Sequence, residues 1–256
     1  MNDKFYNMIF KRKSFHLFRN VGNETISNEE LLDILAVYHT LDSLDPNIKT
    51  EIRIVPAQET TCKRGEEYCI CFYSEKKDGY LRNIGYIGEQ LDLYLVSKNI
   101  ATLWYGIGKI EQESYHQLDF VIMMAIHKVS DQKLYRKNMF KSKRKPIEEI
   151  WEGALIEGVS DLVRFTPSAC NTQPWFVRNK DVLKVFRYKK PGKRGIMPAD
   201  KVSYYNRIDI GIFLCFMELC LTHNGYVFKR QLFDDSGDDE LTLNAIYEIE
   251  VNHEIS

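Results

Sequence analysis

The sequence predicts an α+β protein in which antiparallel-rich sheets are flanked by helices and two similar halves lie in one chain. Two observations lead to this fold class. Segments with helical periodicity alternate with short runs rich in β-branched and aromatic residues. The order of these segments in the first half of the 256 residues recurs in the second half. We therefore predict two repeated halves, residues 1–146 and 147–256, that pack into one compact unit as a pseudo-dimer.

The clearest element of the first half is a helix over residues 28–39. Apolar residues recur along it at helical spacing, and Ser27 with Glu30 forms a capping box at its start. The other predicted elements of this half are a helix over 83–98 and strands over 51–55, 68–73, 101–105 and 120–126.

The second half begins after residues 136–146, which are dense in Lys and Arg and indicate a surface linker or an anion site. A helix is predicted over 147–165 and another over 207–223, because both stretches are largely apolar at helical spacing. The predicted strands of this half cover 175–178, 182–188, 226–233 and 243–251.

The long helices of the two halves can be placed in register. Gly85 and Gly211 are 126 residues apart, and each lies 14 residues before a helix terminator, Asn99 or Gly225. Asn and Gly are the residues that best tolerate the left-handed conformation at a helix end. A weaker match at an offset of 128 aligns residues 33–35 with 161–163 and Pro46 with Pro174. Spacing alone is explained equally well by two helices of similar length that arose by chance.

Composition and charge exclude several classes of partner. The 35 Lys and Arg nearly balance the 36 Asp and Glu, so no overall field favours nucleic acid or an anionic membrane surface. The first 19 residues lack an apolar targeting core, and no run of 18 uncharged apolar residues occurs. We expect a cytoplasmic protein.

The six cysteines are too few for a disulfide scaffold, and their spacings match no zinc pattern. We therefore expect reduced thiols and no metal site. Cys69 and Cys71 would share one face of a strand and are interpreted as core residues.

The most informative stretch for function is residues 164–175. A helix is interrupted there by Pro167, and the chain then passes through small and amide residues into a strand. Backbone N–H groups and the side chains of Ser168, Asn171 and Gln173 could bind one planar ligand with polar edges. A ligand-free turn rich in hydrogen-bonding residues is an equally good interpretation of the residues alone.

The stretch Pro167-Ser-Ala-Cys-Asn-Thr-Gln-Pro-Trp175 resembles the P-S-x-x-N-x-Q-P-W signature of the FMN-dependent nitroreductase family. The resemblance implies a nitroreductase-like fold and a loop that contacts the ribityl chain and isoalloxazine of FMN. The residues that it assigns to FMN binding are Pro167, Ser168, Ala169, Cys170, Asn171 and Gln173. Cys170 replaces a residue that is commonly Gly or Ser in the family.

Residues 11–18 are similar to the family's R-R-S-x-R-x-F segment, in which Arg and Ser bind the FMN phosphate. The resemblance implies that Arg12, Lys13 and Ser14 contact this phosphate, as a guanidinium and a neighbouring hydroxyl are able to do. His16 stands where the family often has a basic residue near flavin N1 and O2. In isolation, a basic triplet near an N-terminus is usually a solvated one.

Two further segments complete the resemblance. The basic residues 141–149 are similar to a family segment that supplies Lys or Arg to the phosphate, which Arg144 matches best and Lys143 less well. Residues 102–106 resemble the family's T-C-W-x-G stretch, whose backbone approaches flavin N5. This similarity places Trp104, Tyr105 and Gly106 at the flavin, although the Trp104 side chain is also interpreted as core.

These elements are distributed unevenly between the halves. The phosphate segments and the Trp-Tyr-Gly stretch lie in residues 1–146, and the signature loop lies in the second half. The matching stretch of the first half, residues 39–46, lacks the Ser, Asn and Gln of the loop. In family dimers each flavin is held by both subunits. We therefore predict one FMN per chain and a monomer that acts as a pseudo-dimer.

The resemblance implies an oxidoreductase that uses NADH or NADPH and reduces a small-molecule electron acceptor, such as a nitroaromatic or a quinone. The cofactor performs the chemistry, so no catalytic side chain is predicted. Two alternatives stay open: a flavin carrier or redox sensor that acts through Cys170, and a relative that has lost flavin.

Overall fold

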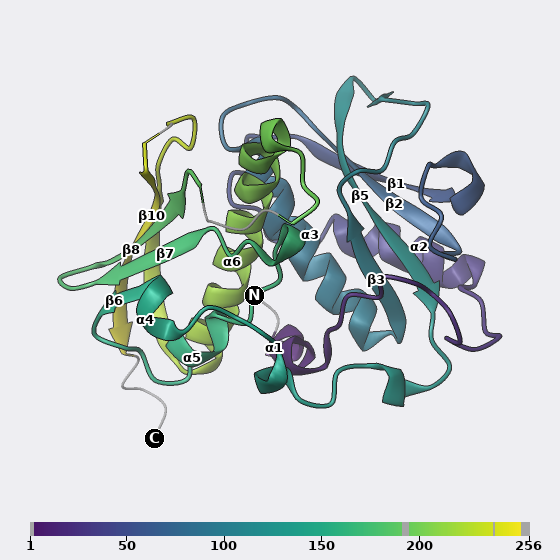
Figure 1. Cartoon of the computed structure of the whole chain (residues 1–256). Helices are drawn as coiled ribbons and strands as arrows, with labels where there is room; N and C mark the ends of the chain where they lie inside the picture. Colours follow the sequence, from purple (N-terminus) through teal and green to yellow (C-terminus); the bar gives the residue numbers. More distant parts are fainter. Residues whose placement is uncertain (1–2, 191–194, 238, 252–256) are drawn as a thin grey trace.

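Two sheets lie on opposite sides of a pair of long helices (Figure 1). The computed structural model describes residues 3–190, 195–237 and 239–251. The central helices, α3 (Tyr80–Ser97) and α6 (Val202–His223), pack against each other. One sheet comes from the first half of the chain and the other from the second. The predicted fold class, helices flanking antiparallel-rich sheets, is confirmed.

In the first half, the sheet order is β1-β2-β5-β3, every pair is antiparallel, and the short β4 also pairs with β5. The elements besides α3 are α1 (Asp3–Lys11), α2 (Asn28–Tyr38), β1 (Thr50–Pro56), η1 (Ala57–Glu59), β2 (Tyr68–Ser74), β3 (Ile100–Tyr105), β4 (Ser114–Tyr115) and β5 (Leu118–Lys128). The predicted capping box of α2 is present, because Ser27 and Glu30 bond each other's backbone N–H.

In the second half, the sheet order is β6-β7-β8-β10-β9, and only β6 and β7 run parallel. The elements besides α6 are α4 (Ile147–Ile150), β6 (Trp151–Gly153), α5 (Ser160–Val163), η4 (Ala169–Asn171), β7 (Trp175–Asn179), β8 (Leu183–Tyr188), η5 (Ala199–Lys201), β9 (Tyr226–Leu232) and β10 (Leu241–Val251). The linker between the halves contains η2 (Gln132–Leu134) and η3 (Met139–Lys141).

The single helix predicted over residues 147–165 is wrong. Trp151 to Gly153 instead adds an edge strand to the second sheet, and only short helices precede and follow it. Gly153 and Gly158 adopt positive φ values of 95° and 69°, which break a right-handed helix. Apolar residues at helical intervals over 147–165 favour one helix in the sequence, in spite of these two glycines.

Helix α1 was not predicted from the sequence. Its buried residues Phe5 and Ile9 lie in a short segment that also carries charged residues.

The two halves share one topology. In each sheet, four strands appear in the spatial order first, second, fourth, third, and the long helix follows the second strand. Helices α2 and α5 occupy matching places, since Ile34 joins a core cluster with α3 while Leu162 and Val163 join one with α6. The weaker offset found in the sequence therefore aligns elements with similar packing.

The helix crossing is reciprocal. A Cβ atom on Gly85 would lie 2.0 Å from the carbonyl oxygen of Ile208, and one on Gly211 would lie 1.9 Å from that of Arg82. Gly85 and Gly211, like Arg82 and Ile208, are 126 residues apart, so each helix meets the other as subunits do across a two-fold axis. Both predicted terminators are left-handed, with φ of 57° at Asn99 and 75° at Gly225.

Two buried carboxylates repeat the same offset. Asp92 of α3 accepts a hydrogen bond from Trp104 Nε1 at 3.1 Å, and Glu218 of α6 accepts one from Arg230 Nη1 at 2.6 Å. Each donor is also 126 residues from its counterpart. These matches favour an internal duplication over chance, while the exact boundary at residue 146 stays a prediction. Within the described ranges, no helix has the length and apolar character needed to cross a membrane.

Replacing Gly85 with Ala should destabilise the protein, because the new methyl group meets backbone that cannot move away easily. We expect the free energy of unfolding to fall by about 1–3 kcal/mol or more, despite the better helix propensity of Ala. Urea unfolding will measure it, with Leu32→Ala on the exposed face of α2 as the matched control, for which a change below about 0.5 kcal/mol is expected. Equal stability of G85A and wild type would contradict the close crossing.

Candidate functional site

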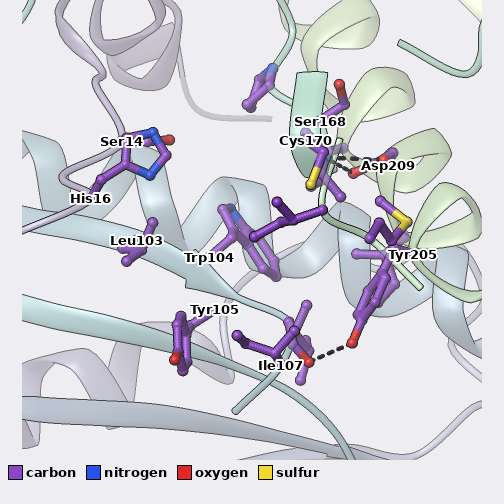
Figure 2. A pocket seen from close by; sticks show the side chains of 18 of the residues that line it. Ser14, His16, Leu103, Trp104, Tyr105, Ile107, Ser168, Cys170, Tyr205 and Asp209 are labelled. Atoms are coloured by element: carbon purple, nitrogen blue, oxygen red, sulfur yellow. Dashed lines mark hydrogen bonds between the residues drawn. The ribbon is translucent and has the colours of Figure 1, made fainter. Parts of the chain in front are cut away.

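A cavity of about 260 Å³ opens between the two halves (Figure 2). One side is formed by the segment after α1 and by the end of β3, and the other by the signature loop and the start of α6. The predicted site residues that line it are Arg12, Ser14, His16, Trp104, Tyr105, Gly106, Pro167, Ser168, Ala169 and Cys170. The structure thus brings together residues that are far apart in the sequence.

The segment after α1 is held beside β3 by backbone pairing. Ser14 forms a bridge with Thr102, and the N–H of Phe15 donates to the Thr102 carbonyl at 3.0 Å. This pairing directs Ser14 and His16 toward the cavity (Figure 2). Lys13 is exposed and lies outside the lining, where its ammonium donates to the Leu134 carbonyl at 3.0 Å.

Arg12 is buried, and two acidic residues of α3 face it. Its Nε and Nη2 atoms each lie 2.7 Å from Asp92 Oδ2, and Nε lies 3.4 Å from Glu89 Oε1. Burial alone would lower the pKa of Arg12, but Asp92 and Glu89 outweigh it and the pKa is raised. Burial raises the pKa of Glu89 well above its ordinary value. Arg12 therefore lines the cavity as part of a buried ion pair.

Three more arginines gather near Arg12. Burial and the charges of Arg136, Arg12 and Arg164 lower the pKa of Arg144 to about 10. Burial and the charge of Arg12 likewise lower the pKa of Arg136 to about 10, against the opposing effect of Glu89. Among the described residues, the buried Nε atoms of Arg144 and Arg164 have no hydrogen-bond partner. Clustered guanidinium groups with unsatisfied donors form a site suited to an anion.

Arg136 and Arg164 were absent from the sequence-based site. Each carried a weak signal, since Arg136 begins the basic stretch before the second half and Arg164 immediately precedes the signature loop. Nothing in their spacing indicated that the linker would fold back against this loop.

The linker and the signature loop are joined by hydrogen bonds. Arg144 Nη1 donates to Asn171 Oδ1 at 2.7 Å, and Asn171 Nδ2 donates to the Lys143 carbonyl at 3.2 Å. The N–H of Lys145 donates to Gln173 Oε1 at 2.8 Å. The side chains of Asn171 and Gln173 thus hold the linker. Together with Lys143 and Arg144 they lie outside the cavity lining, and their contacts with a cofactor stay predictions.

The loop itself has an unusual backbone. Cys170, Asn171 and Gln173 all have positive φ, between 49° and 56°. Such conformations are uncommon for residues other than glycine and are concentrated at functional sites. Ser168 stabilises this path because its Oγ accepts a hydrogen bond from the N–H of Gln173 at 3.0 Å. Cys170 is exposed and lies at the cavity.

Asp209 of α6 holds the signature loop through hydrogen bonds. The N–H of Ala169 donates to its two carboxylate oxygens at 3.0 and 3.2 Å, and the Thr172 hydroxyl donates to Oδ2 at 3.5 Å. Burial raises the pKa of Asp209 to about 8, although these hydrogen bonds oppose the rise. Sequence reasoning missed this residue, whose only signal was an acidic side chain in an otherwise apolar helix.

Tyr205 closes the cavity at Gly106. A Cβ on Gly106 would lie 2.7 Å from the Tyr205 ring, and the Tyr205 hydroxyl donates to the Gly106 carbonyl at 2.5 Å. The family resemblance explains Gly106 by a close approach of the main chain to a flavin. In the structure, the tyrosine ring is the group that requires the missing side chain, and the approach to a flavin stays a prediction.

The two helix-flanked sheets, with a cavity between the two halves, have the arrangement of a nitroreductase fold, as a superposition shows. A solved structure described as a "putative nitroreductase" from Thermotoga maritima superposes with a TM-score of 0.60 at 18% identity, covering 96% of this chain and 93% of that chain. A nitroreductase family protein from Clostridium difficile has a TM-score of 0.47 at 12% identity, and the match covers 60% of this chain and 100% of that chain. A nitroreductase-like family protein from Bacillus cereus has a TM-score of 0.39 at 13% identity, and the match covers 60% of this chain and 96% of that chain.

The sequence itself assigns the family. The model of the family described as "Putative TM nitroreductase" matches residues 4–221, and the chain belongs to this family. No curated protein matches the chain in sequence. Family membership indicates an oxidoreductase.

Replacing Asp209 with Asn should remove a pH dependence of stability. The folded state retains the Asp209 proton up to about pH 8, whereas an ordinary carboxyl has a pKa of 3.8. The stabilisation by the protonated Asp209 side chain is complete below pH 3.8 and is lost as the pH rises through about 8. Urea unfolding at about pH 5 and about pH 8 should show the wild type losing stability relative to D209N. Asp33→Asn, at an exposed site, is the control, and its stability should depend on pH as that of the wild type does. If the stability of D209N changes with pH in parallel with the wild type, the raised pKa of Asp209 is refuted.

Proposed function

We propose that this protein is an FMN-dependent NAD(P)H oxidoreductase that reduces a small-molecule acceptor such as a nitroaromatic or a quinone. One observation carries the proposal: a cluster of arginines with unsatisfied buried donors lies beside a cavity that the family's signature loop lines. FMN has a dianionic end and a planar aromatic end, and these two environments suit one end each.

The arginine cluster fits the phosphate. Arg144 and Arg164 each have a buried Nε without a partner among the described residues, and a phosphate oxygen would satisfy both. Burial and the neighbouring guanidinium charges both lower the pKa values of Arg136 and Arg144, and a bound anion would oppose both effects. Arg12 is already paired with Asp92, so we assign it to positioning more than to charge neutralisation.

The cavity fits the ring and the ribityl chain. Apolar side chains of Leu103, Ile122 and Ile212 line it, and the hydroxyl groups of Ser14 and Ser168 are available at its edge. A mostly apolar pocket with a few placed polar groups is the usual form of a cofactor site. When bound, FMN supplies the redox chemistry, accepting hydride from the nicotinamide and passing electrons to the acceptor.

The protein's own contribution is to orient the two substrates and exclude water. Ile107 and Ile196 line the cavity yet remain 54% and 88% exposed, which makes an apolar rim suited to planar aromatic molecules. His16 faces the same space and is exposed. We propose that it takes the place of the basic residue that other family members have near flavin N1 and O2.

The character of a second, smaller cavity is a further argument that each chain binds only one FMN. Its volume is about 180 Å³, and its lining includes Gly79, Arg82, Asn83 and Phe233, which lie 126 residues from Tyr205, Ile208, Asp209 and Ile107 of the first cavity. It is therefore the symmetry-related counterpart of the first. Asn83 accepts hydrogen bonds from the N–H groups of Leu44 and Asp45, much as Asp209 anchors the signature loop.

Arg82 makes this second cavity unsuitable for a flavin. Its guanidinium is buried and donates to Asn244 and to the Phe233 carbonyl at 2.8 to 3.0 Å. The equivalent position in the first cavity is the apolar Ile208. A charged, internally bonded side chain thus stands where the first cavity offers an apolar wall. We therefore propose one working site per chain, in a chain that acts as a monomer. The free cysteines suit the reducing cytoplasm that we propose as its location.

Arg164→Met should weaken FMN binding without affecting riboflavin. Loss of a charge-assisted hydrogen bond of about 1.5–3 kcal/mol lowers affinity roughly 10- to 100-fold. Flavin fluorescence titration with FMN and with riboflavin will separate the phosphate from the ring. Lys137→Met, which removes one exposed charge beside Arg136, is the control. Equal losses for both flavins would place Arg164 away from the phosphate.

The purified chain should retain about one FMN per polypeptide, because Arg82 occupies the second cavity. It should also be monomeric, because both sides of the first cavity come from one chain. Absorbance at the flavin and protein bands gives the ratio, and light scattering gives the mass. Addition of NADH or NADPH should bleach the flavin band, and a quinone or nitroaromatic should restore it. A ratio near two, or a flavin that no nicotinamide bleaches, would overturn the stoichiometry or the activity respectively.

A further inference from the structure

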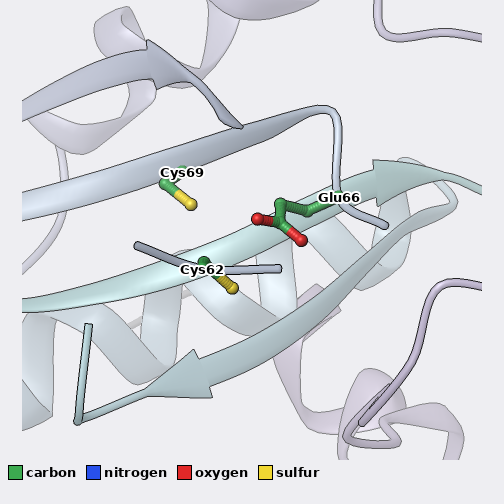
Figure 3. A group of neighbouring side chains, drawn as sticks. All are labelled: Cys62, Glu66 and Cys69. Carbon is green, nitrogen blue, oxygen red and sulfur yellow. The ribbon is translucent and has the colours of Figure 1, made fainter. Parts of the chain in front are cut away.

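A second cluster of reactive side chains lies away from the cavity, on the first sheet. Cys62 and Glu66 belong to the loop that precedes β2, and Cys69 lies within β2. All three are buried, and one ligand atom from each lies within 4.8 Å of the other two. Figure 3 shows the three side chains as close neighbours, two from the loop and one from the strand.

The carboxylate of Glu66 provides an independent indication of a missing partner. Glu66 is only 8% exposed, and its Oε2 accepts a hydrogen bond from the N–H of Arg64 at 2.7 Å. Its other oxygen, Oε1, is buried without a hydrogen-bond partner in the described parts of the chain. A buried carboxylate oxygen is costly unless a proton or a cation satisfies it.

We propose that Cys62, Glu66 and Cys69 bind one thiophilic divalent cation, with Zn²⁺ as the best match. Zinc binds thiolates at about 2.3 Å and carboxylates at about 2.0 Å, so its ligands lie within about 4.6 Å of one another. In the cluster the corresponding atoms lie within 4.8 Å of one another, so they would need to draw slightly closer around the ion. Two sulfur ligands select zinc over the hard cations magnesium and calcium.

The surroundings of the cluster provide a polar neighbour and a compensating charge. The Thr60 hydroxyl lies 3.5 Å from Cys69 Sγ and accepts a hydrogen bond from the N–H of Cys62. A water molecule bonded to this hydroxyl would take the fourth position of a tetrahedral zinc. Lys63 follows Cys62 and donates to the Thr60 carbonyl at 3.2 Å. Its ammonium partly offsets the negative charge of two thiolates and a carboxylate.

The ion would tie the loop before β2 to the sheet. The same loop carries Arg64, which lines the cavity and places its guanidinium 5.6 Å from the centre of the Tyr105 ring. The Arg64 carbonyl also accepts a hydrogen bond from the N–H of Phe18 at 2.8 Å. The metal therefore has a structural role at one wall of the cavity. Its binding does not depend on the identity of the cofactor.

The test is metal uptake by the full-length chain. Protein purified without chelator should contain about one zinc per chain by mass spectrometric metal analysis. Cobalt added to the metal-free protein should produce a thiolate-to-cobalt charge-transfer band. Cys69→Ser and Cys62→Ser should abolish this band, and Glu66→Gln, which keeps the size of the side chain, should weaken cobalt affinity at least 10-fold, as even outer ligands do.

Cys71→Ala is the matched control, because this buried thiol lies two residues from Cys69 in β2 and outside the cluster. It should bind cobalt as the wild type does. Circular dichroism of each variant shows whether it has folded, and Glu66→Gln decides the question if a cysteine variant does not fold. The proposal is overturned by a wild type that takes up neither zinc nor cobalt, by uptake that is unchanged in E66Q, or by a disulfide between Cys62 and Cys69 in non-reducing peptide mapping.

Discussion

The close crossing of α3 and α6 at Gly85 and Gly211 is the contact on which the rest of the molecule depends. Each glycine leaves room for the backbone of the other helix, so the helices approach more closely than any side chain would permit. Because the contact is reciprocal, it orients the two halves like subunits related by a two-fold axis. This orientation brings the end of β3 opposite the start of α6 and creates the space between them.

A symmetric scaffold holds two sites that have become different. The same positions of the two central helices face the two cavities, yet one pair carries Ile208 and Asp209 and the other carries Arg82 and Asn83. Both Asp209 and Asn83 hold a loop by accepting backbone hydrogen bonds. What distinguishes the cavities is an apolar wall in one and a buried guanidinium in the other. The duplicated framework thus keeps its packing while the linings of the two cavities differ.

Buried charge is organised around the first cavity in two ways. Arg12 is matched by Asp92 and Glu89, which makes it part of the framework. Arg136 and Arg144 are balanced less well, since burial and neighbouring guanidinium groups lower the pKa of both. The linker that carries these two arginines is fastened to the signature loop through Asn171 and Gln173. The signature loop therefore contributes to the junction between the halves as well as to the cavity.

The sequence by itself determined the fold class, most of the elements and the register of the two long helices. These depend on local features: periodicity, a capping box at Ser27, and residues that tolerate positive φ at Asn99 and Gly225. It also placed Ser14, His16 and Ser168 in one site through a resemblance of short motifs. The broken helix at Gly153 was misread because local periodicity competes with pairing to a strand, and that pairing is non-local. Only the tertiary structure brought Arg136 and Arg164 close to Arg144, turned Lys13 away from the cavity and put Glu66 beside two cysteines. Such positions depend on how segments that are distant in the sequence pack against one another. The spacing of residues along the chain does not reveal these contacts.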